Sequence, residues 1–309
     1  MKHLPLHGLC SMSLLLFKRP SRPAGKRYPH YLCLVISILL IMSSNVQSSS
    51  TKLLLFAGAA SKPATEEVVK HFYNTAAVPV DLVFGGSGFV LSQMKLSRRG
   101  DIYFPGSSDF MEVAKREGLV YPESEKIVVY LVPAINVQKG NPKGIHSLKD
   151  LTRKGIRLAI ANPEMVCVGT YAVEIIERNL NSKEKESIRR NLVNYTESCE
   201  KTANVISLRA VDAVIGWRVF QHWDPERIET IYLKPDEIPR IGYIPIAISR
   251  FTKDKSSAQG FIDFLLSPAG KSIFQKHRYL MDLKEARRFT KPDTLVGGEY
   301  ILPKEWRTQ

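Results

Sequence analysis

Short apolar runs alternate with segments of helical periodicity from Leu53 to Leu280. The runs "KLLLF", "VDLVF", "DIYF" and "GIRLAIA" are each followed by such a segment. Strands that alternate with helices form mostly parallel sheets, with helices on both faces. The chain is therefore predicted to be an α/β protein. Its 309 residues suffice for one large domain or two modest ones.

Two of the predicted strand-to-helix turns have the same form. "FAGAAS" ends at Ser61 and "FGGSG" contains Ser87, so each turn places a hydroxyl beside the free N–H groups of a helix start. In parallel sheets, ligands bind where strands end and helices begin. Helix N-termini favour negative charge, so the two serines indicate an anion-binding site. The alternative is that Ser61 and Ser87 serve only as helix N-caps.

The glycines around Ser87 do not match three common motifs. A phosphate-binding loop requires a Lys that is absent after these glycines. A nucleophile elbow would need glycine where Phe89 stands, and a dinucleotide fingerprint would need glycine where Leu91 stands. We therefore expect an anion held by this turn to be bound without being transformed.

The N-terminal residues have the order of an export signal. A basic stretch precedes the apolar run "YLCLVISILLIM" (Tyr31–Met42), and the small polar stretch "SSNVQSSS" follows it. The apolar run is short for a membrane-spanning helix. We expect residues 1–48 to be a signal peptide or an uncleaved N-terminal anchor, with Met12 as an alternative start. The protein is predicted to be exported to the periplasm.

The charge distribution argues against nucleic acid as a partner. The net charge is +14, of which residues 1–50 contribute +6 and the remainder +8. In that remainder, Lys and Arg are interleaved with Glu and Asp, which is typical of a solvated mixed surface.

The chain resembles the periplasmic molybdate-binding proteins of ABC transporters, which are type II periplasmic solute-binding proteins. The resemblance covers about residues 52–280. It is carried by "LLLFAGAASKPATEEVVKHF", "VDLVFGGSGFVLSQM", "GDIYFPGSSDFMEVAKREGLV", "VYLVPAINVQKGNPKGIHSLKDL", "GIRLAIANPEMVCVGTYAVEII" and "FIDFLLSPAGKSIFQKHRYL". It implies two α/β lobes with a ligand cleft between them. The first lobe would hold residues 52–132 and 243–309, the second residues 133–242, and "VYLVPAI" and "GYIPIAI" would be the crossings.

The resemblance also implies a ligand set and partners. Ser61 and Ser87 of the first lobe would bind a tetrahedral oxyanion such as molybdate or tungstate. In the second lobe, backbone N–H groups at Val168 and Cys199 would contribute, and Trp217 stands where the family has a tyrosine. These hydroxyl and N–H donors carry no full charge. They stabilise a dianion through hydrogen bonds and still permit its release. An ABC permease would receive the anion. We expect a monomer that meets the membrane only through the permease or an uncleaved signal.

Cys167 and Cys199 are the cysteines that remain once residues 1–48 are removed. Two such cysteines in an exported protein usually pair, and the resemblance places both at one edge of the cleft. A disulfide between them is therefore predicted. The alternative is a soft-metal or thiol-dependent binding site that uses the same two sulfurs.

An enzymatic role is not expected. A nucleophile needs a nearby base, and the implied cleft residues include no histidine. The isolated histidines are His71, His146, His222 and His277. No cofactor is predicted, and no metal other than that of a bound molybdate or tungstate.

Overall fold

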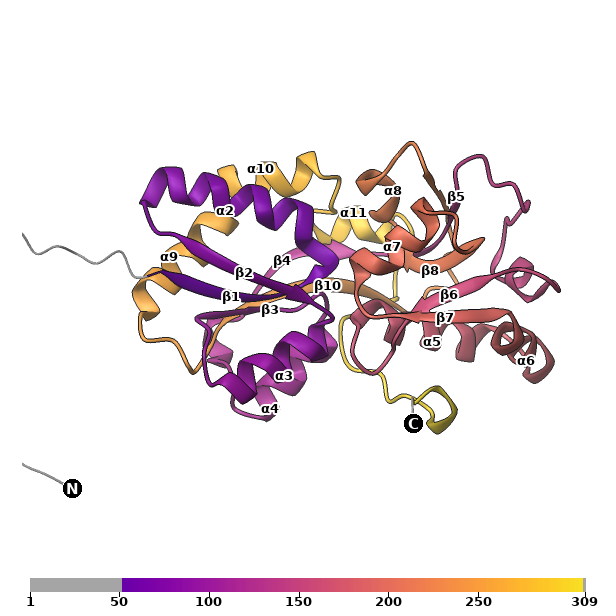
Figure 1. The fold of residues 1–309 in the computed structure, drawn as a ribbon, viewed down its shortest axis with the longest axis horizontal. Coiled ribbons are helices and arrows are strands. Elements are labelled where there is room, and N and C mark those ends of the chain that lie inside the picture. The colour runs from indigo at the N-terminus through magenta and orange to yellow at the C-terminus, as the bar shows by residue number, and fades with distance from the viewer. Residues whose placement is uncertain (1–51, 308–309) are drawn as a thin grey trace, which may run out of the picture. The chain divides into compact units, whose positions relative to one another are not determined.

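The computed structural model describes residues 52–307, and these residues form two sheets that carry helices on both faces (Figure 1). The α/β prediction is thus confirmed. The predicted signal or anchor, residues 1–48, lies outside the described residues. The described part belongs to one compact unit, Ser49–Gln309.

The first sheet has six strands in the order β11-β10-β3-β1-β2, with β4 paired to β10. Strand β1 pairs in parallel with β2 and β3, whereas β10 is antiparallel to β3 and β4. Helices α2, α9 and α10 cover one face, and α3 and α4 cover the other (Figure 1). The strands are β1 (Leu53–Gly58), β2 (Val80–Gly85), β3 (Ile102–Phe104), β4 (Lys126–Leu131), β10 (Arg240–Ile248) and β11 (Leu295–Val296). The helices are α2 (Lys62–Ala76), α3 (Ser87–Ser97), α4 (Ser108–Arg116), α9 (Lys255–Leu266) and α10 (Pro268–Lys276), with the short 3-10 helices η1 (Ala59–Ser61) and η2 (Pro122–Ser124).

The second sheet has five strands in the order β7-β6-β8-β5-β9. Helices α5 and α6 cover one face, and α7 and α8 lie on the other (Figure 1). The strands are β5 (Pro133–Gln138), β6 (Leu158–Ala161), β7 (Leu192–Thr196), β8 (Ala213–Trp217) and β9 (Ile228–Ile231). The helical elements are η3 (Leu148–Thr152), α5 (Cys167–Asn179), α6 (Ser182–Asn191), α7 (Cys199–Ser207) and α8 (Phe220–Trp223).

The apolar run "KIVVYLVPAI", which contains the implied crossing "VYLVPAI", is divided between the two sheets. Strand β4 ends at Leu131 in the first sheet, and β5 starts at Pro133 in the second. Proline has no N–H to donate to a ladder, so it is tolerated at the start of a strand. The chain returns from the second lobe to the first before Arg240, because β10 starts there and pairs only within the first sheet.

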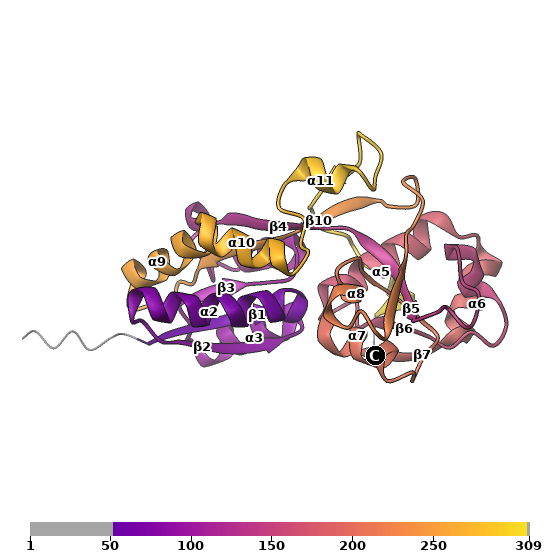
Figure 2. The same cartoon turned by 90° about the horizontal axis from the view of Figure 1, so that it is seen from above.

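The tail differs from the expectation that residues 281–309 belong to the first lobe. Residues 283–307, here called the C-terminal strap, contact both lobes. The strap starts with α11 (Leu283–Arg287) on the side where β4 and β10 lie (Figure 2). Glu299 then pairs with Arg116 of α4 at 2.9 Å. At the end, Trp306 in η4 (Lys304–Trp306) is 1% exposed within the apolar cluster of the second lobe, and its Nε1 donates to Glu177 of α5 at 2.7 Å.

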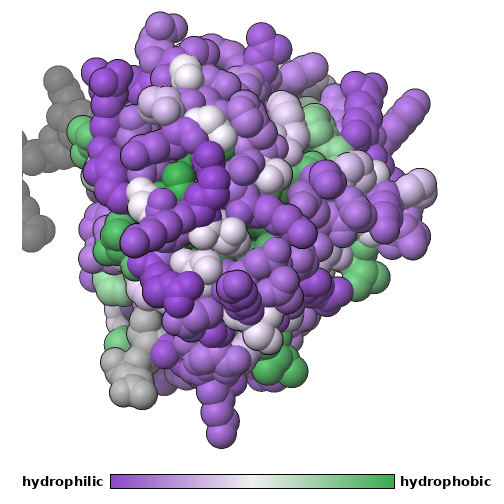
Figure 3. All heavy atoms as spheres, turned by 90° about the vertical axis from the view of Figure 1, so that its right-hand side faces the viewer, coloured by the Kyte–Doolittle hydropathy of each residue, from purple (hydrophilic) through white to green (hydrophobic). Residues whose placement is uncertain are grey.

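The surface of the second-lobe end is largely hydrophilic, with isolated hydrophobic side chains (Figure 3). Between residues 52 and 307, no helix combines the length and apolar character that a membrane crossing requires.

Replacement of Trp306 with alanine should destabilise the protein, because it removes a buried indole and its hydrogen bond. Truncation of a buried Trp costs about 3–5 kcal/mol of unfolding free energy. Ile301→Ala in the same strap is the control, since Ile301 is 84% exposed and should change stability by less than about 0.5 kcal/mol. Urea unfolding followed by circular dichroism measures both. Equal midpoints for the two variants would show that the strap does not pack as described.

Candidate functional site

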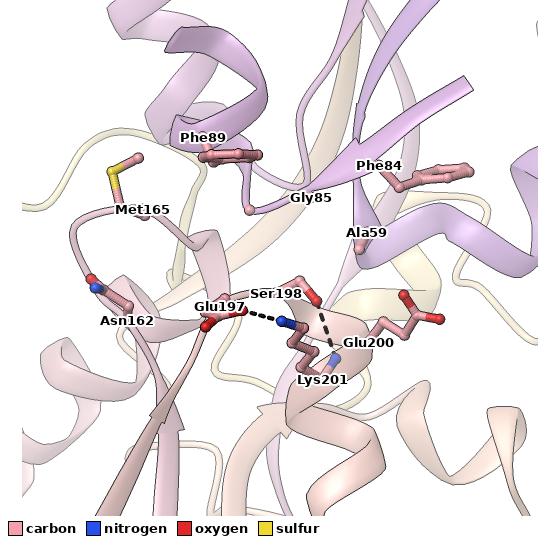
Figure 4. Close-up of a pocket in the computed structure, with 11 residues that line it drawn as sticks. Ala59, Phe84, Gly85, Phe89, Asn162, Met165, Glu197, Ser198, Glu200 and Lys201 are labelled. Carbon is pink, nitrogen blue, oxygen red and sulfur yellow. Dashed lines mark hydrogen bonds and ion pairs between the residues drawn. The ribbon is translucent and has the colours of Figure 1, made fainter. Parts of the chain in front are cut away.

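A cavity of about 350 Å³ lies where the two lobes meet (Figure 4). The first lobe contributes the ends of β1 and β2 and the start of α3, and the second lobe contributes the loop before α5 and the start of α7. Residues within two positions of Ser61, Ser87 and Cys199 line this cavity, whereas these three residues themselves do not. Its lining comprises Ala59, Phe84, Gly85, Gly86, Phe89, Asn162, Met165, Glu197, Ser198, Glu200 and Lys201.

The lobes touch each other beside this cavity. The backbone N–H of Gly88 donates to the carbonyl of Met165 at 2.9 Å. Lys62 at the start of α2 pairs with Glu200 on α7 at 2.6 Å. A Cβ on Gly86 would lie 2.7 Å from the Met165 carbonyl oxygen, so only glycine permits this approach. The structure is thus closed at the cleft.

Ser61 and Ser87 are both buried, and neither side chain caps its helix. Ser61 precedes α2 without a capping hydrogen bond, and Gly86, not Ser87, is the N-cap of α3. Each hydroxyl oxygen accepts one hydrogen bond, Ser61 Oγ from Thr65 Oγ1 and Ser87 Oγ from the N–H of Gly106, both at 2.9 Å. Because these bonds use the oxygens as acceptors, the serine protons remain available to a ligand.

Cys167 of the second lobe reaches the first lobe close to Ser87. A Cβ on Gly106 would lie 2.6 Å from Cys167 Sγ and 3.5 Å from Ser87 Oγ. Cys167 Sγ and Cys199 Sγ are 3.7 Å apart, and both thiols are free and buried in this structure. Each cysteine is the first residue of a helix, α5 and α7 respectively. The structure therefore brings the predicted pair together, while the disulfide itself stays a prediction.

Val168 and Trp217 lie beside the sulfur of Cys199. Burial is the main cause that raises the pKa of the Cys199 thiol, and Cys167 raises it further. The Val168 backbone N–H and the Trp217 indole N–H act in the opposite direction, since they favour the thiolate. Trp217 is fully buried, and no oxygen or nitrogen acceptor among residues 52–307 pairs with its Nε1. The predicted second-lobe residues are thus grouped around Cys199.

Four polar side chains near these residues escaped the sequence analysis. Tyr171 on α5 is fully buried, and the guanidinium of Arg240 lies 3.9 Å from the centre of its ring. Arg240 bonds to Asp109 of the first lobe at 2.8 Å and to Glu174 of the second at 2.6 Å. Tyr171 follows Cys167 by one helical turn, a spacing the sequence contained. The ion pairs span long stretches of chain and left no local signal.

The described residues include no group of three or more His, Cys, Asp or Glu side chains that could hold a metal ion. A soft-metal site in this part of the chain would therefore depend on the two sulfurs of Cys167 and Cys199 together with groups of other types.

The structure has two α/β lobes, which strand connections join and which close over buried hydroxyl and N–H donors. These features are typical of the class of two-lobe binding proteins. The particular family follows from comparison with known proteins. The bacterial extracellular solute-binding protein family matches residues 53–280, and the chain belongs to this family. The strap lies beyond the matched residues.

Individual relatives are distant in sequence. The chain is 22% identical over 252 residues to the molybdate-binding protein ModA of Mycobacterium tuberculosis, covering 79% of this chain and 93% of that protein. Among solved structures, it is similar to the periplasmic molybdate-binding protein of Azotobacter vinelandii (TM-score 0.65, 16% identity, 75% of this chain and 100% of that one). It is also similar to the sulfate-binding protein SubI of M. tuberculosis (TM-score 0.68, 16% identity, 80% and 94%). These similarities confirm the type II periplasmic binding protein fold, and the named relatives are binding proteins.

Oxidation should convert Cys167 and Cys199 to a disulfide with little movement of the backbone, because their sulfurs are already 3.7 Å apart. The bridge would close a loop of 32 residues, which the chain-entropy model equates with about 3–4 kcal/mol of stability. Thiol counting on unfolded, unreduced, exported protein should find neither thiol free. Its melting temperature should fall on reduction. Two free thiols would contradict the prediction.

Alkaline pH should destabilise the reduced protein through Cys199. Burial raises its folded-state pKa, whereas an unfolded cysteine ionises near pH 8.5. The stabilising contribution is thus complete below about pH 8.5 and is lost as the pH rises towards the raised folded pKa, by at most about 1.4 kcal/mol per pH unit. Urea midpoints of reduced wild type and Cys199→Ser between pH 8 and pH 10 provide the measurement. The same slope in both proteins would refute the assignment.

Proposed function

We propose that this protein is the periplasmic solute-binding component of an ABC transporter, and that it binds a tetrahedral oxyanion, with molybdate and tungstate the favoured ligands. The ligand would be held between the lobes and passed to the permease. The protein would act without turnover or cofactor.

The observation that best supports this proposal is the character of the groups near the lobe contact. Ser61 and Ser87 present hydroxyl protons not used in the bonds described above. Helices α3, α5 and α7 begin beside them, at Ser87, Cys167 and Cys199. Helix N-termini and hydroxyls are donors that stabilise an anion without adding a full counter-charge. The acidic groups that line the cavity, Glu197 and Glu200, are each paired with a lysine.

The similarities agree with an oxyanion ligand, since the relatives described above carry names of molybdate-binding and sulfate-binding proteins. Molybdate, tungstate and sulfate share the tetrahedral shape and the double negative charge. The choice among them is therefore a matter of size and donor geometry.

Replacement of Ser87 or Ser61 with alanine should weaken oxyanion binding. Loss of a hydrogen bond to a charged group costs about 1.5–3 kcal/mol, which corresponds to a roughly tenfold to hundredfold higher Kd. Ser272→Ala on the exposed side of α10 is the control, because its hydroxyl bonds only to a backbone carbonyl within its own helix. Calorimetric titration with molybdate, tungstate and sulfate measures the change, and Trp217 emission should respond to binding. Unchanged affinity in both site variants would contradict the site.

A second candidate is a soft-metal or thiol-dependent binding protein, favoured by the 3.7 Å separation of the two sulfurs. Titration of reduced protein with cadmium, followed by thiolate absorbance, discriminates the two. Cadmium binding that is lost in Cys167→Ser and Cys199→Ser, with no oxyanion binding in the wild type, would favour this candidate.

A further inference from the structure

The phenol hydroxyl of Tyr171 is an unpartnered polar group inside the closed protein. The residue is fully buried, and its oxygen has no hydrogen-bond partner among residues 52–307. Native proteins pair the large majority of their buried polar groups, and an unpaired one calls for a specific explanation. The burial itself raises the pKa of Tyr171, so the hydroxyl keeps its proton and remains a donor.

One stripe of helix α5 faces the first lobe, and Tyr171 lies in the middle of it. Residues separated by three or four positions share a helix face. Cys167, one turn earlier, has its sulfur against the first-lobe backbone at Gly106. Glu174, one turn later, bonds to Arg240 at 2.6 Å, and Arg240 also bonds to first-lobe Asp109. Cys167 thus contacts the first lobe directly, and Glu174 is linked to the first lobe through Arg240.

The ring of Tyr171 is held firmly from two sides. Trp217 packs against it edge-on, with 4.8 Å between ring centres, and the Arg240 guanidinium lies over it at 3.9 Å. A Cβ on Gly242 would lie 3.3 Å from the tyrosine oxygen and 3.1 Å from the Trp217 ring, so the backbone at Gly242 packs closely against both side chains. A fixed ring with a free hydroxyl is pre-organised for a ligand and loses little conformational entropy on binding.

We propose that Tyr171 Oη donates a hydrogen bond to the oxyanion held between the lobes, and that it is a specificity-determining residue of that site. This inference rests on the proposed function. It adds a hydroxyl donor from α5 to the side of the site where Trp217 offers only an N–H. The positive charge of Arg240 over the ring draws electron density from the phenol and makes it a stronger donor towards an anion.

The test is Tyr171→Phe, which removes the hydroxyl and keeps the ring. The full exported protein is compared with wild type in two measurements: the melting temperature without ligand, and the affinity for molybdate and for sulfate by calorimetry. Because the hydroxyl is unpaired without ligand, the variant should melt at the same or a higher temperature. Its Kd for the preferred anion should nevertheless rise at least tenfold.

Tyr279→Phe is the matched control for stability, since its hydroxyl is buried but donates to the carbonyl of Ala60 at 2.7 Å. That variant should melt at a lower temperature than wild type. Tyr171→Phe with unchanged affinity, or with the same loss of stability as Tyr279→Phe and no weaker binding, would overturn the inference while leaving the proposed function intact. A wild-type protein that binds neither anion would overturn both.

Discussion

The buried guanidinium of Arg240 joins parts of the chain that are far apart in sequence. Arg240 lies at the start of β10 and is 3% exposed. It bonds to Asp109 of the first lobe, to Glu174 of the second, and to the carbonyl of Gly298 in the C-terminal strap at 2.7 Å. Burial acts to lower the pKa of Arg240, but Tyr171 and the two carboxylates outweigh it, so the pKa is raised and the charge is kept. Removing one member of a buried ionic group costs about 3–5 kcal/mol, since the remaining charge loses its partner.

The ion pairs of Arg240 link the strand connections between the two lobes, here called the hinge, to whether the cleft is open or closed. Asp109 and Glu174 belong to different lobes, so Arg240 bonds to both only when the lobes are close together. The same closed state depends on Gly86 and Gly88, whose backbones approach the loop at Met165. An anion held by groups of both lobes would stabilise the closed state further, because a ligand shifts a conformational equilibrium by its differential affinity. The strap, which lies outside the family match, adds contacts to both lobes on the hinge side.

The fold was largely predictable because its signals are local. Apolar runs followed by helical periodicity predicted the strands β1, β2, β3 and β6 and the helices α2, α3, α4 and α5 that follow them. Helix α6 was missed because it is almost entirely polar, although its capping box of Asn181 and Glu184 was present in the sequence. Neither α7 nor β7 was recognised, since neither has a long apolar pattern. The contact of the tail with the second lobe was not predictable, because it is made by Trp306 and no periodicity shows which lobe an isolated tryptophan will contact.

The site was predictable only in part, for a related reason. Ser61 and Ser87 occur in turns whose sequence shows their position at helix starts. The Arg240 ion pairs bridge 131 residues to Asp109 and 66 residues to Glu174, and no local pattern connects such distant charges. The proximity of Cys167 and Cys199 followed from a family resemblance and not from their spacing. Physical chemistry of the sequence therefore predicted Ser61 and Ser87 as donors, while the tertiary structure was needed to show which charges lie near them.

The charge of the Cys199 sulfur affects whether an anion can bind next to Cys167 and Cys199. A helix N-terminus usually favours the thiolate and lowers the pKa of a cysteine, and Cys199 is the first residue of α7. Here burial prevails, because the pKa of Cys199 is raised despite the N–H groups of Val168 and Trp217. A thiolate beside Cys167 would repel a dianion, whereas a neutral thiol or a disulfide does not. The burial of the Cys199 sulfur thus keeps the start of α7 free of a negative charge, and the positive end of this helix remains available to an anionic ligand.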